Sequence, residues 1–159
     1  MGVTIVCAIG CSTTTIQYVP IPDTAPVASA VSPNAKVFVI RPSGFYAGGV
    51  PVHVSATGNN LKNTSIGKLA NGGFLCFEQS PGELALRILT EPPGGLIAGP
   101  SSSHSITDRV AAGEVYFFRV GFPRWNSFNA FVKDVKIRKM TPFEAKKYLK
   151  KAKSPVPAD

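Results

Sequence analysis

The sequence predicts a mainly β protein, a single antiparallel β-sandwich of about seven strands with a C-terminal amphipathic α-helix. Three observations carry this prediction. Short segments rich in β-branched and aromatic residues recur along the chain and are separated by turns that contain glycine or proline. Charged residues make up only 16% of the 159 residues, and the 15 glycines and 14 prolines favour turn-rich β structure over a helical bundle. The periodicity becomes helical only after Thr141.

The predicted strands are short, and each is bounded by residues that favour turns. Within residues 83–89, alternation places Leu84, Leu86 and Ile88 on one face. The strongest hairpin signal of the chain is Asn71-Gly72-Gly73, so we expect the segments on either side of it to form a hairpin. The strands are expected at residues 36–41, 50–54, 65–69, 74–77, 83–89, 105–110, 115–120 and 128–138.

A basic helix is expected over residues 142–152, at the end of the sandwich domain that we assign to residues 35–153. Thr141 and Glu144 form a capping box around Pro142, which suits the first helical position. An apolar stripe along this segment predicts that one face packs on the domain, while lysines occupy the remaining faces. The stripe consists of Ala145, Tyr148, Leu149 and Ala152, and the lysines are Lys146, Lys147, Lys150 and Lys151.

The positive charge of the chain is concentrated near this helix. The formal net charge is +8, and nine of the 17 lysines and arginines lie between Lys133 and Lys153. In one interpretation the stripe packs on the sheet and the lysines remain in water. In another the lysines contact an anionic membrane surface. We do not expect nucleic acid as a partner, because aromatic residues do not interleave with the lysines.

The first 11 residues resemble the end of a bacterial lipoprotein signal, clipped at its beginning. Residues 3–9 are apolar but too short to span a bilayer, and no lysine or arginine precedes them. Ala8-Ile9-Gly10-Cys11 is similar to a lipobox, in which small residues precede the cysteine that receives lipid, although the pattern prefers leucine where Ala8 stands. Ser12 then implies the outer membrane, facing the periplasm. The alternative interpretation is that residues 3–9 form a buried first strand.

Residues 12–34 are expected to form an extended linker between this segment and the sandwich. They are rich in threonine, proline, alanine and serine, a composition that cannot bury enough surface to fold. Residues 154–159 are expected to form a short flexible tail. An apolar segment, a cysteine and a proline-rich linker are the order that an anchored envelope domain requires.

Several segments together resemble an uncharacterised bacterial family of small envelope lipoproteins, a domain of unknown function. They are residues 37–43, Gly48, Pro81-Gly82-Glu83, residues 112–117 and residues 140–145. The Pro-Gly-Glu turn is also similar to that of transthyretin-like and carboxypeptidase-regulatory-like sandwiches, but Leu84 stands where those domains usually have histidine. The resemblance implies a β-sandwich and no catalytic residue.

The candidate ligand contacts are Arg41, Tyr46 and Trp125. An arginine at a strand end can bind a turn carbonyl or a carboxylate, and we prefer that structural role for Arg41. Tyr46 and Trp125 lie in predicted loops, where exposed aromatic residues often mark contacts, although we prefer the interpretation that they fill the ends of the sandwich.

No metal or cofactor is expected. His53 and His104 are isolated in the sequence, and the cysteines lack partners at the spacing of a zinc site. Cys76 lies within an apolar strand and is expected to act as a small hydrophobic residue. Ser65 and Lys68 have the spacing of serine acyl-enzymes, but that chemistry requires a helix N-terminus and a strand is predicted there.

These features predict a non-catalytic lipoprotein of the cell envelope, a binding or structural module held at the membrane through Cys11. Its expected partner, besides the membrane, is an envelope protein or a cell-wall component. Two alternatives remain open, an envelope hydrolase and a membrane-surface adaptor that acts through the basic helix. A polar cleft joining a histidine or Cys76 to a carboxylate favours the hydrolase, whereas a filled sandwich favours the module.

Overall fold

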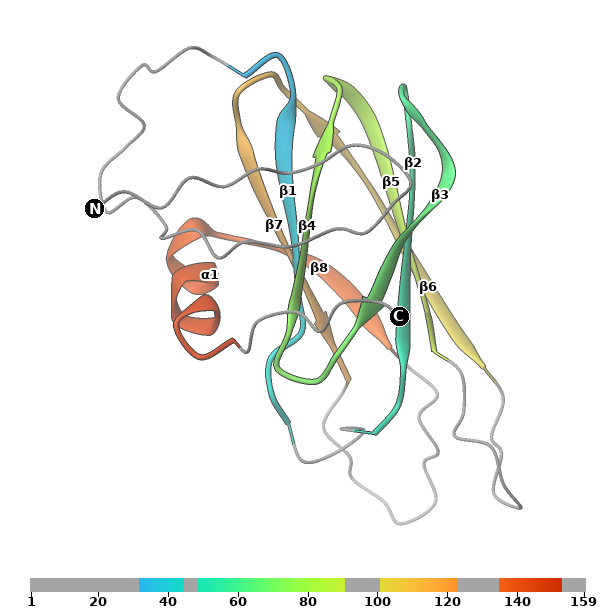
Figure 1. Cartoon of the computed structure of the whole chain (residues 1–159), viewed down its shortest axis with the longest axis vertical. Coiled ribbons are helices and arrows are strands. Elements are labelled where there is room, and N and C mark those ends of the chain that lie inside the picture. Colours follow the sequence, from blue (N-terminus) through green and yellow to red (C-terminus); the bar gives the residue numbers. More distant parts are fainter. Residues whose placement is uncertain (1–31, 45–48, 91–100, 123–134, 153–159) are drawn as a thin grey trace.

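The computed structural model describes residues 32–44, 49–90, 101–122 and 135–152, which form two four-stranded sheets and one helix (Figure 1). The predicted β-sandwich is confirmed, with eight strands in this part of the chain. We call the sheet with strand order β4-β1-β7-β8 the first sheet and the sheet with order β3-β2-β5-β6 the second sheet. The elements are β1 (Ala35–Ile40), β2 (Val52–Gly58), β3 (Leu61–Leu69), β4 (Phe74–Gln79), β5 (Gly82–Thr90), β6 (Ser102–Val110), β7 (Val115–Gly121), β8 (Lys136–Met140) and α1 (Pro142–Leu149).

The two sheets differ in the direction of their strands. All neighbours in the second sheet are antiparallel. In the first sheet β1 pairs antiparallel with β4 but parallel with β7, and β7 pairs antiparallel with β8. The antiparallel sandwich that the sequence predicts therefore contains one parallel pair. It can form because the chain crosses between the sheets after β1, β3, β4 and β6, so that β1 and β7 meet although most of the domain separates them in sequence.

The prediction of a hairpin at Asn71-Gly72-Gly73 is wrong. The chain does reverse there, with Gly72 at φ 76°, but β3 and β4 belong to different sheets and do not pair. The turn is a corner between the two layers. The Asn71 side chain fixes it to the segment after β1, since it accepts a hydrogen bond from the Gly44 amide at 3.0 Å and donates one to the Gly44 carbonyl at 2.9 Å.

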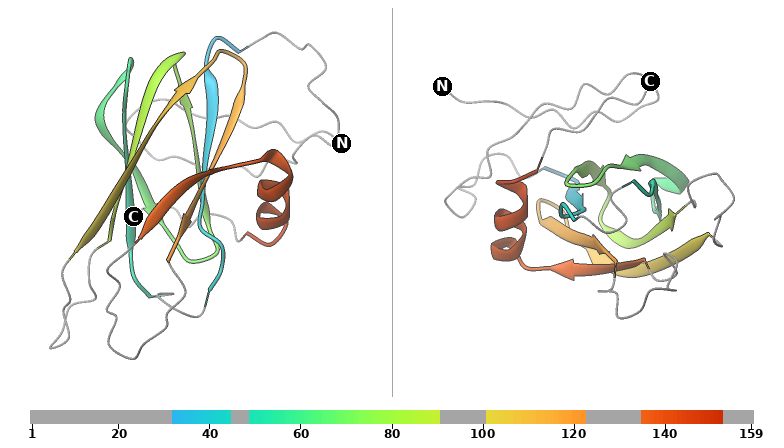
Figure 2. Two further views of the ribbon diagram at one scale, coloured as in Figure 1. Left: turned by 180° about the vertical axis from the view of Figure 1, so that it is seen from behind. Right: turned by 90° about the horizontal axis from the view of Figure 1, so that it is seen from below.

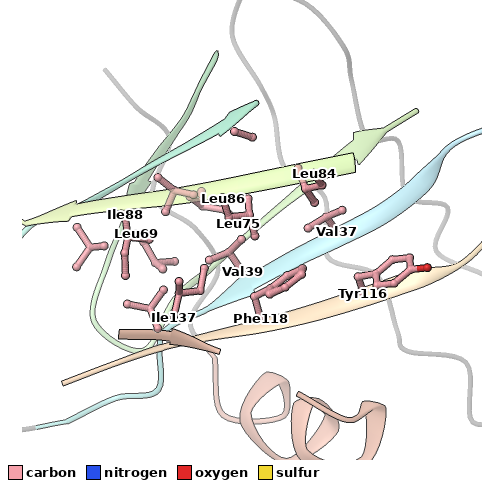
Figure 3. Packing of buried hydrophobic residues seen from close by; sticks show 14 of the residues in the cluster. Val37, Val39, Leu69, Leu75, Leu84, Leu86, Ile88, Tyr116, Phe118 and Ile137 are labelled. Carbon is pink, nitrogen blue, oxygen red and sulfur yellow. The ribbon is translucent and has the colours of Figure 1, made fainter. Parts of the chain in front are cut away.

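The main core lies between the sheets, as Figure 3 shows. Leu84, Leu86 and Ile88 are fully buried on the inner face of β5, which confirms the predicted alternation. Val37 and Val39 of β1 face them from the first sheet. Such burial of apolar surface is the dominant favourable term in folding, at roughly 25 cal/mol per Å².

A second apolar cluster lies between the outer face of the first sheet and α1, and Figure 2 shows the helix on that side of the sandwich. Phe38 and Ile40 point outward from β1 into this cluster, and the Phe38 ring stacks on Phe117 at 5.3 Å between centroids. Ala145 and Leu149 are the buried residues of the helix. Because the helix covers part of this outer face, β1 is largely apolar on both faces. Its sequence is therefore a nearly continuous run of apolar residues and does not alternate between apolar and polar ones.

The predicted cap of α1 is confirmed. The Thr141 hydroxyl accepts a hydrogen bond from the Glu144 amide at 3.2 Å, and the Glu144 carboxylate accepts one from the Thr141 amide at 3.2 Å. The helix ends earlier than expected, at Leu149 instead of residue 152, with Lys150 as its C-cap. Ala152 still packs against the second cluster. Within the described residues, no helix is long and apolar enough to cross a bilayer.

The connection between β6 and β7 is held by Tyr116, a feature that the sequence analysis missed. The Tyr116 hydroxyl accepts a hydrogen bond from the Ala111 amide at 3.0 Å and donates one to the Glu114 carboxylate at 2.6 Å. This is the arrangement of a tyrosine corner, in which a tyrosine at the start of a strand bonds back to the preceding backbone. The bond to Glu114, followed by burial, raises the pKa of the Tyr116 hydroxyl.

Candidate functional site

Arg41 occupies the end of the sandwich where β1 ends and the chain crosses to the second sheet. Its side chain is only 3% exposed. The guanidinium Nη1 donates hydrogen bonds to the carbonyls of Val50, at 2.8 Å, and Leu69, at 3.1 Å. Val50 lies just before β2, and Leu69 ends β3. Arg41 therefore binds the second sheet to the end of the first, and the predicted contact with turn carbonyls is confirmed.

The surroundings of Arg41 suit a buried arginine. Its guanidinium carbon lies 5.1 Å from the centre of the Phe122 ring, in the geometry of a cation–π contact. Burial lowers the pKa of the guanidinium, because removal from water disfavours its charged form. Two carbonyl oxygens and the face of a ring offset part of that cost. The observed contacts of Arg41 thus serve the fold.

The other two candidate ligand contacts, Tyr46 and Trp125, lie outside the described residues, as does Cys11. The strands that precede them in the sequence run side by side, however. Tyr46 follows β1, and Trp125 follows β7, the strand that runs parallel to β1. The strand ends before both connections are therefore neighbours, at the same end as Arg41.

The residues considered for catalysis are dispersed over separate strands. Cys76 packs against the second apolar cluster, as predicted for a small hydrophobic residue. His53 lies on β2 and His104 on β6, where its Nδ1 accepts a hydrogen bond from the Ile137 amide at 3.5 Å. Ser65 lies on β3, not at a helix N-terminus. Among the described residues, no group of three or more histidine, cysteine, aspartate or glutamate side chains is placed to hold a metal ion.

An open polar depression of about 550 Å³ lies on β5 and β6. It is lined by Glu83, Thr107, Asp108 and Arg109. The Asp108 carboxylate is bound to the Lys139 ammonium of β8 at 2.7 Å, so it ties the edges of the two sheets together. Among the described residues, the lining of this depression contains neither histidine nor cysteine.

The C-terminal segment that carries the four lysines also carries an aromatic residue that the sequence analysis did not select. Phe143, in the first turn of α1, is 86% exposed. Lys147, Lys150 and Lys151 are exposed, and Lys146 is half-buried. Phe143 was overlooked because it lies inside the capping sequence and outside the apolar stripe. Its helical spacing from the lysines was the signal that could have identified it.

Glu144 is the acidic residue of this helix, and its carboxylate contacts residues that precede the helix. Its carboxylate accepts a hydrogen bond from Arg138 Nη2 at 3.2 Å in addition to the bond from the Thr141 amide. The backbone hydrogen bond of Thr141, and after it the Arg138 side chain, holds the pKa of Glu144 below its ordinary value. The carboxylate therefore serves the helix cap and the contact with β8.

Comparison with known proteins identified no relative of this chain: no family model, curated protein or solved structure matches it. The similarity to a family of envelope lipoproteins therefore stays a prediction that depends on the residues quoted for it.

Proposed function

We propose that this protein is a non-catalytic lipoprotein of the bacterial cell envelope, held at the outer membrane by a lipid on Cys11. The sandwich acts as a binding or structural module on the periplasmic side, and its partner is an envelope protein or a cell-wall component. A cysteine that carries several acyl chains would hold firmly, since each buried methylene contributes about 0.8 kcal/mol.

The main support for a non-catalytic function is that polar side chains among the described residues make structural contacts. Arg41 binds backbone carbonyls, Asp108 binds a lysine of the facing sheet, and Glu144 caps a helix. The two histidines and Cys76 lie on different strands. This dispersal supports a module over a hydrolase, because acid–base or nucleophilic chemistry requires such groups within hydrogen-bond reach of one another.

The anchor is supported by the order of the first three segments of the sequence. A lipobox-like Ala8-Ile9-Gly10-Cys11 precedes a proline-rich stretch, and the folded domain begins with β1 at Ala35. A linker of the kind that this composition predicts would let the domain reach a partner away from the lipid surface.

The test is a Cys11→Ser variant expressed in a bacterial cell from its natural coding context, with Cys7→Ser as the matched control. Both variants remove one thiol from the same apolar segment. We expect Cys11→Ser to abolish incorporation of labelled fatty acid and to move the protein from the membrane fraction to the soluble fraction, whereas Cys7→Ser keeps both properties. Unchanged membrane recovery of the Cys11 variant, or equal loss with both variants, contradicts the proposal.

A further inference from the structure

One face of α1 combines an exposed aromatic residue with positive charge. Lys146, Lys147 and Lys150 follow Phe143 by three, four and seven positions, the spacing that places side chains on a single helical face. Ala145 and Leu149 lie on the opposite side, buried against the first sheet. The packing of the helix therefore fixes which face is presented outward. We call Phe143, Lys146, Lys147 and Lys150 the outward face of α1.

Phe143 has no role in either apolar cluster. Its side chain is 86% exposed, whereas the other large apolar side chain that lies exposed in the described part of the chain, Val115, is 46% exposed. The capping box of this helix requires Thr141 and Glu144 but no aromatic residue between them. Single exposed apolar side chains are common on protein surfaces, so the exposure of Phe143 gains its weight from the lysines that share its helical face.

The electrostatic field of the outward face is positive. Residues 142–152 contain four lysines and one glutamate, and that glutamate is bound by the Thr141 amide and by Arg138. Lysines on long flexible stems can keep their ammonium groups at the level of lipid phosphates while an apolar side chain enters the layer beneath. Helices that bind the interface of a bilayer combine lysines or arginines with apolar side chains that enter it, and the outward face of α1 supplies three lysines and one aromatic side chain.

We propose that the outward face of α1 docks on the surface of a bilayer that contains anionic phospholipids, with Phe143 at the boundary between headgroups and acyl chains. The lysines contact the phosphates of the headgroups. A convex helix of two turns offers an acidic protein little area to cover, whereas a bilayer requires only charge and a side chain that can insert. The membrane setting rests on the proposed function, but the binding itself does not require a lipid on Cys11.

The experiment uses the full chain with Cys11→Ser, so that it carries no lipid, and measures co-sedimentation with vesicles. One set contains phosphatidylglycerol and phosphatidylcholine, and the other contains phosphatidylcholine alone. We expect binding to the anionic vesicles only, weakening as salt rises. Because each lysine near such a surface contributes a factor of about five, Lys147→Gln with Lys150→Gln should weaken binding about 25-fold.

The matched control is Lys62→Gln with Lys68→Gln, which removes the same charge from exposed positions on β3 in the other sheet. This control should change binding less than about twofold. Equal weakening by the two double variants would mean that net charge alone drives binding, and it would overturn the proposal, as would failure of the parent to bind anionic vesicles at low salt. Circular dichroism of each variant verifies that the sandwich is folded.

Two substitutions at Phe143 test insertion separately from charge. Phe143→Ser should weaken binding about tenfold, because apolar burial of a side chain is lost. Phe143→Trp should retain binding, and the difference between its emission spectrum and that of the parent should shift to the blue on anionic vesicles. Parent-like binding by the serine variant, or a tryptophan difference spectrum that does not shift, refutes insertion. These results do not depend on the Cys11 fractionation, so either proposal can fail without the other.

Discussion

Replacing Arg41 by methionine should destabilise the sandwich by about 3 kcal/mol. The side chain is 3% exposed, and Nη1 is within 2.8 and 3.1 Å of two carbonyl oxygens from the second sheet. Methionine keeps much of the apolar stem but donates no hydrogen bond. The carbonyls of Val50 and Leu69 lose this donor at the point where the ends of the sheets meet.

The magnitude follows from two opposing contributions. Hydrogen bonds from a charged donor contribute about 1.5–3 kcal/mol each, which gives about 3–6 kcal/mol for the two. Against this, methionine relieves the desolvation of a buried guanidinium, the effect that lowers the pKa of Arg41. A cost of a few kcal/mol for that desolvation leaves a net loss of about 3 kcal/mol. Arg41→Lys, which retains the charge but not the planar group over Phe122, should recover about half of it.

Urea unfolding followed by circular dichroism measures the effect. With a slope of about 2 kcal/mol per molar urea, the midpoint of Arg41→Met should fall by about 1.5 M. The control is Arg87→Met, which removes an exposed arginine from the outer face of β5 and should change stability by less than about 0.5 kcal/mol. A loss below about 1 kcal/mol for Arg41→Met, or a gain, would refute the reasoning, since the hydrogen bonds would then not exceed the desolvation cost.

Two further predictions concern the ends of strands and the helix. Tyr116→Phe should cost about 1–2 kcal/mol in urea unfolding, and because the folded state raises the pKa of Tyr116, its contribution is complete below its ordinary pKa of 10.0 and is lost as pH rises through the folded value. An alkaline decline in stability that is as steep in Tyr116→Phe as in the parent would contradict this assignment. Thr141→Ala should cost about 1 kcal/mol through loss of the cap. Because the folded state lowers the pKa of Glu144, the stability that its ionised carboxylate contributes is present above pH 4.5 and is lost as pH falls through the folded value. Glu144→Gln, which removes the titrating carboxylate, should therefore flatten the decline in stability at acid pH, and an equally steep decline in this variant would exclude Glu144 as its cause.

Local patterns in the sequence were sufficient for the features that depend on neighbouring residues. Alternation in residues 83–89 identified the inner face of β5, and the spacing of Thr141 and Glu144 identified the helix cap. Arg41 next to Pro42 indicated a contact with turn carbonyls. In each case the partner or the period lies within a few residues, or the chemistry of one side chain restricts what it can do at a strand end.

The features that were missed depend on contacts between distant segments. Asn71-Gly72-Gly73 correctly predicts a reversal of the chain, but the same turn chemistry serves a hairpin and a corner between sheets. Here β4 pairs with β1, in the other sheet, and Phe38 of β1 contacts Phe74 of β4 in the second apolar cluster. Tyr116 is the exception, because its partners Ala111 and Glu114 lie within five residues of it, and a tyrosine at the start of a strand was a local signal for this corner.

The same long-range packing bears on the proposed membrane surface. Phe38 and Ile40 of β1 are covered by the helix, and Arg119 of β7 stacks on Tyr148 at 5.1 Å, so α1 is joined to the centre of the first sheet. Its outward face is therefore presented by the domain as one body. A helix that became ordered only on contact with lipid would bind more weakly, because the entropy cost of ordering it would be subtracted from the binding free energy. Here the sandwich already holds the helix in place, and for this reason we expect one aromatic side chain and three lysines to give measurable binding to an anionic bilayer.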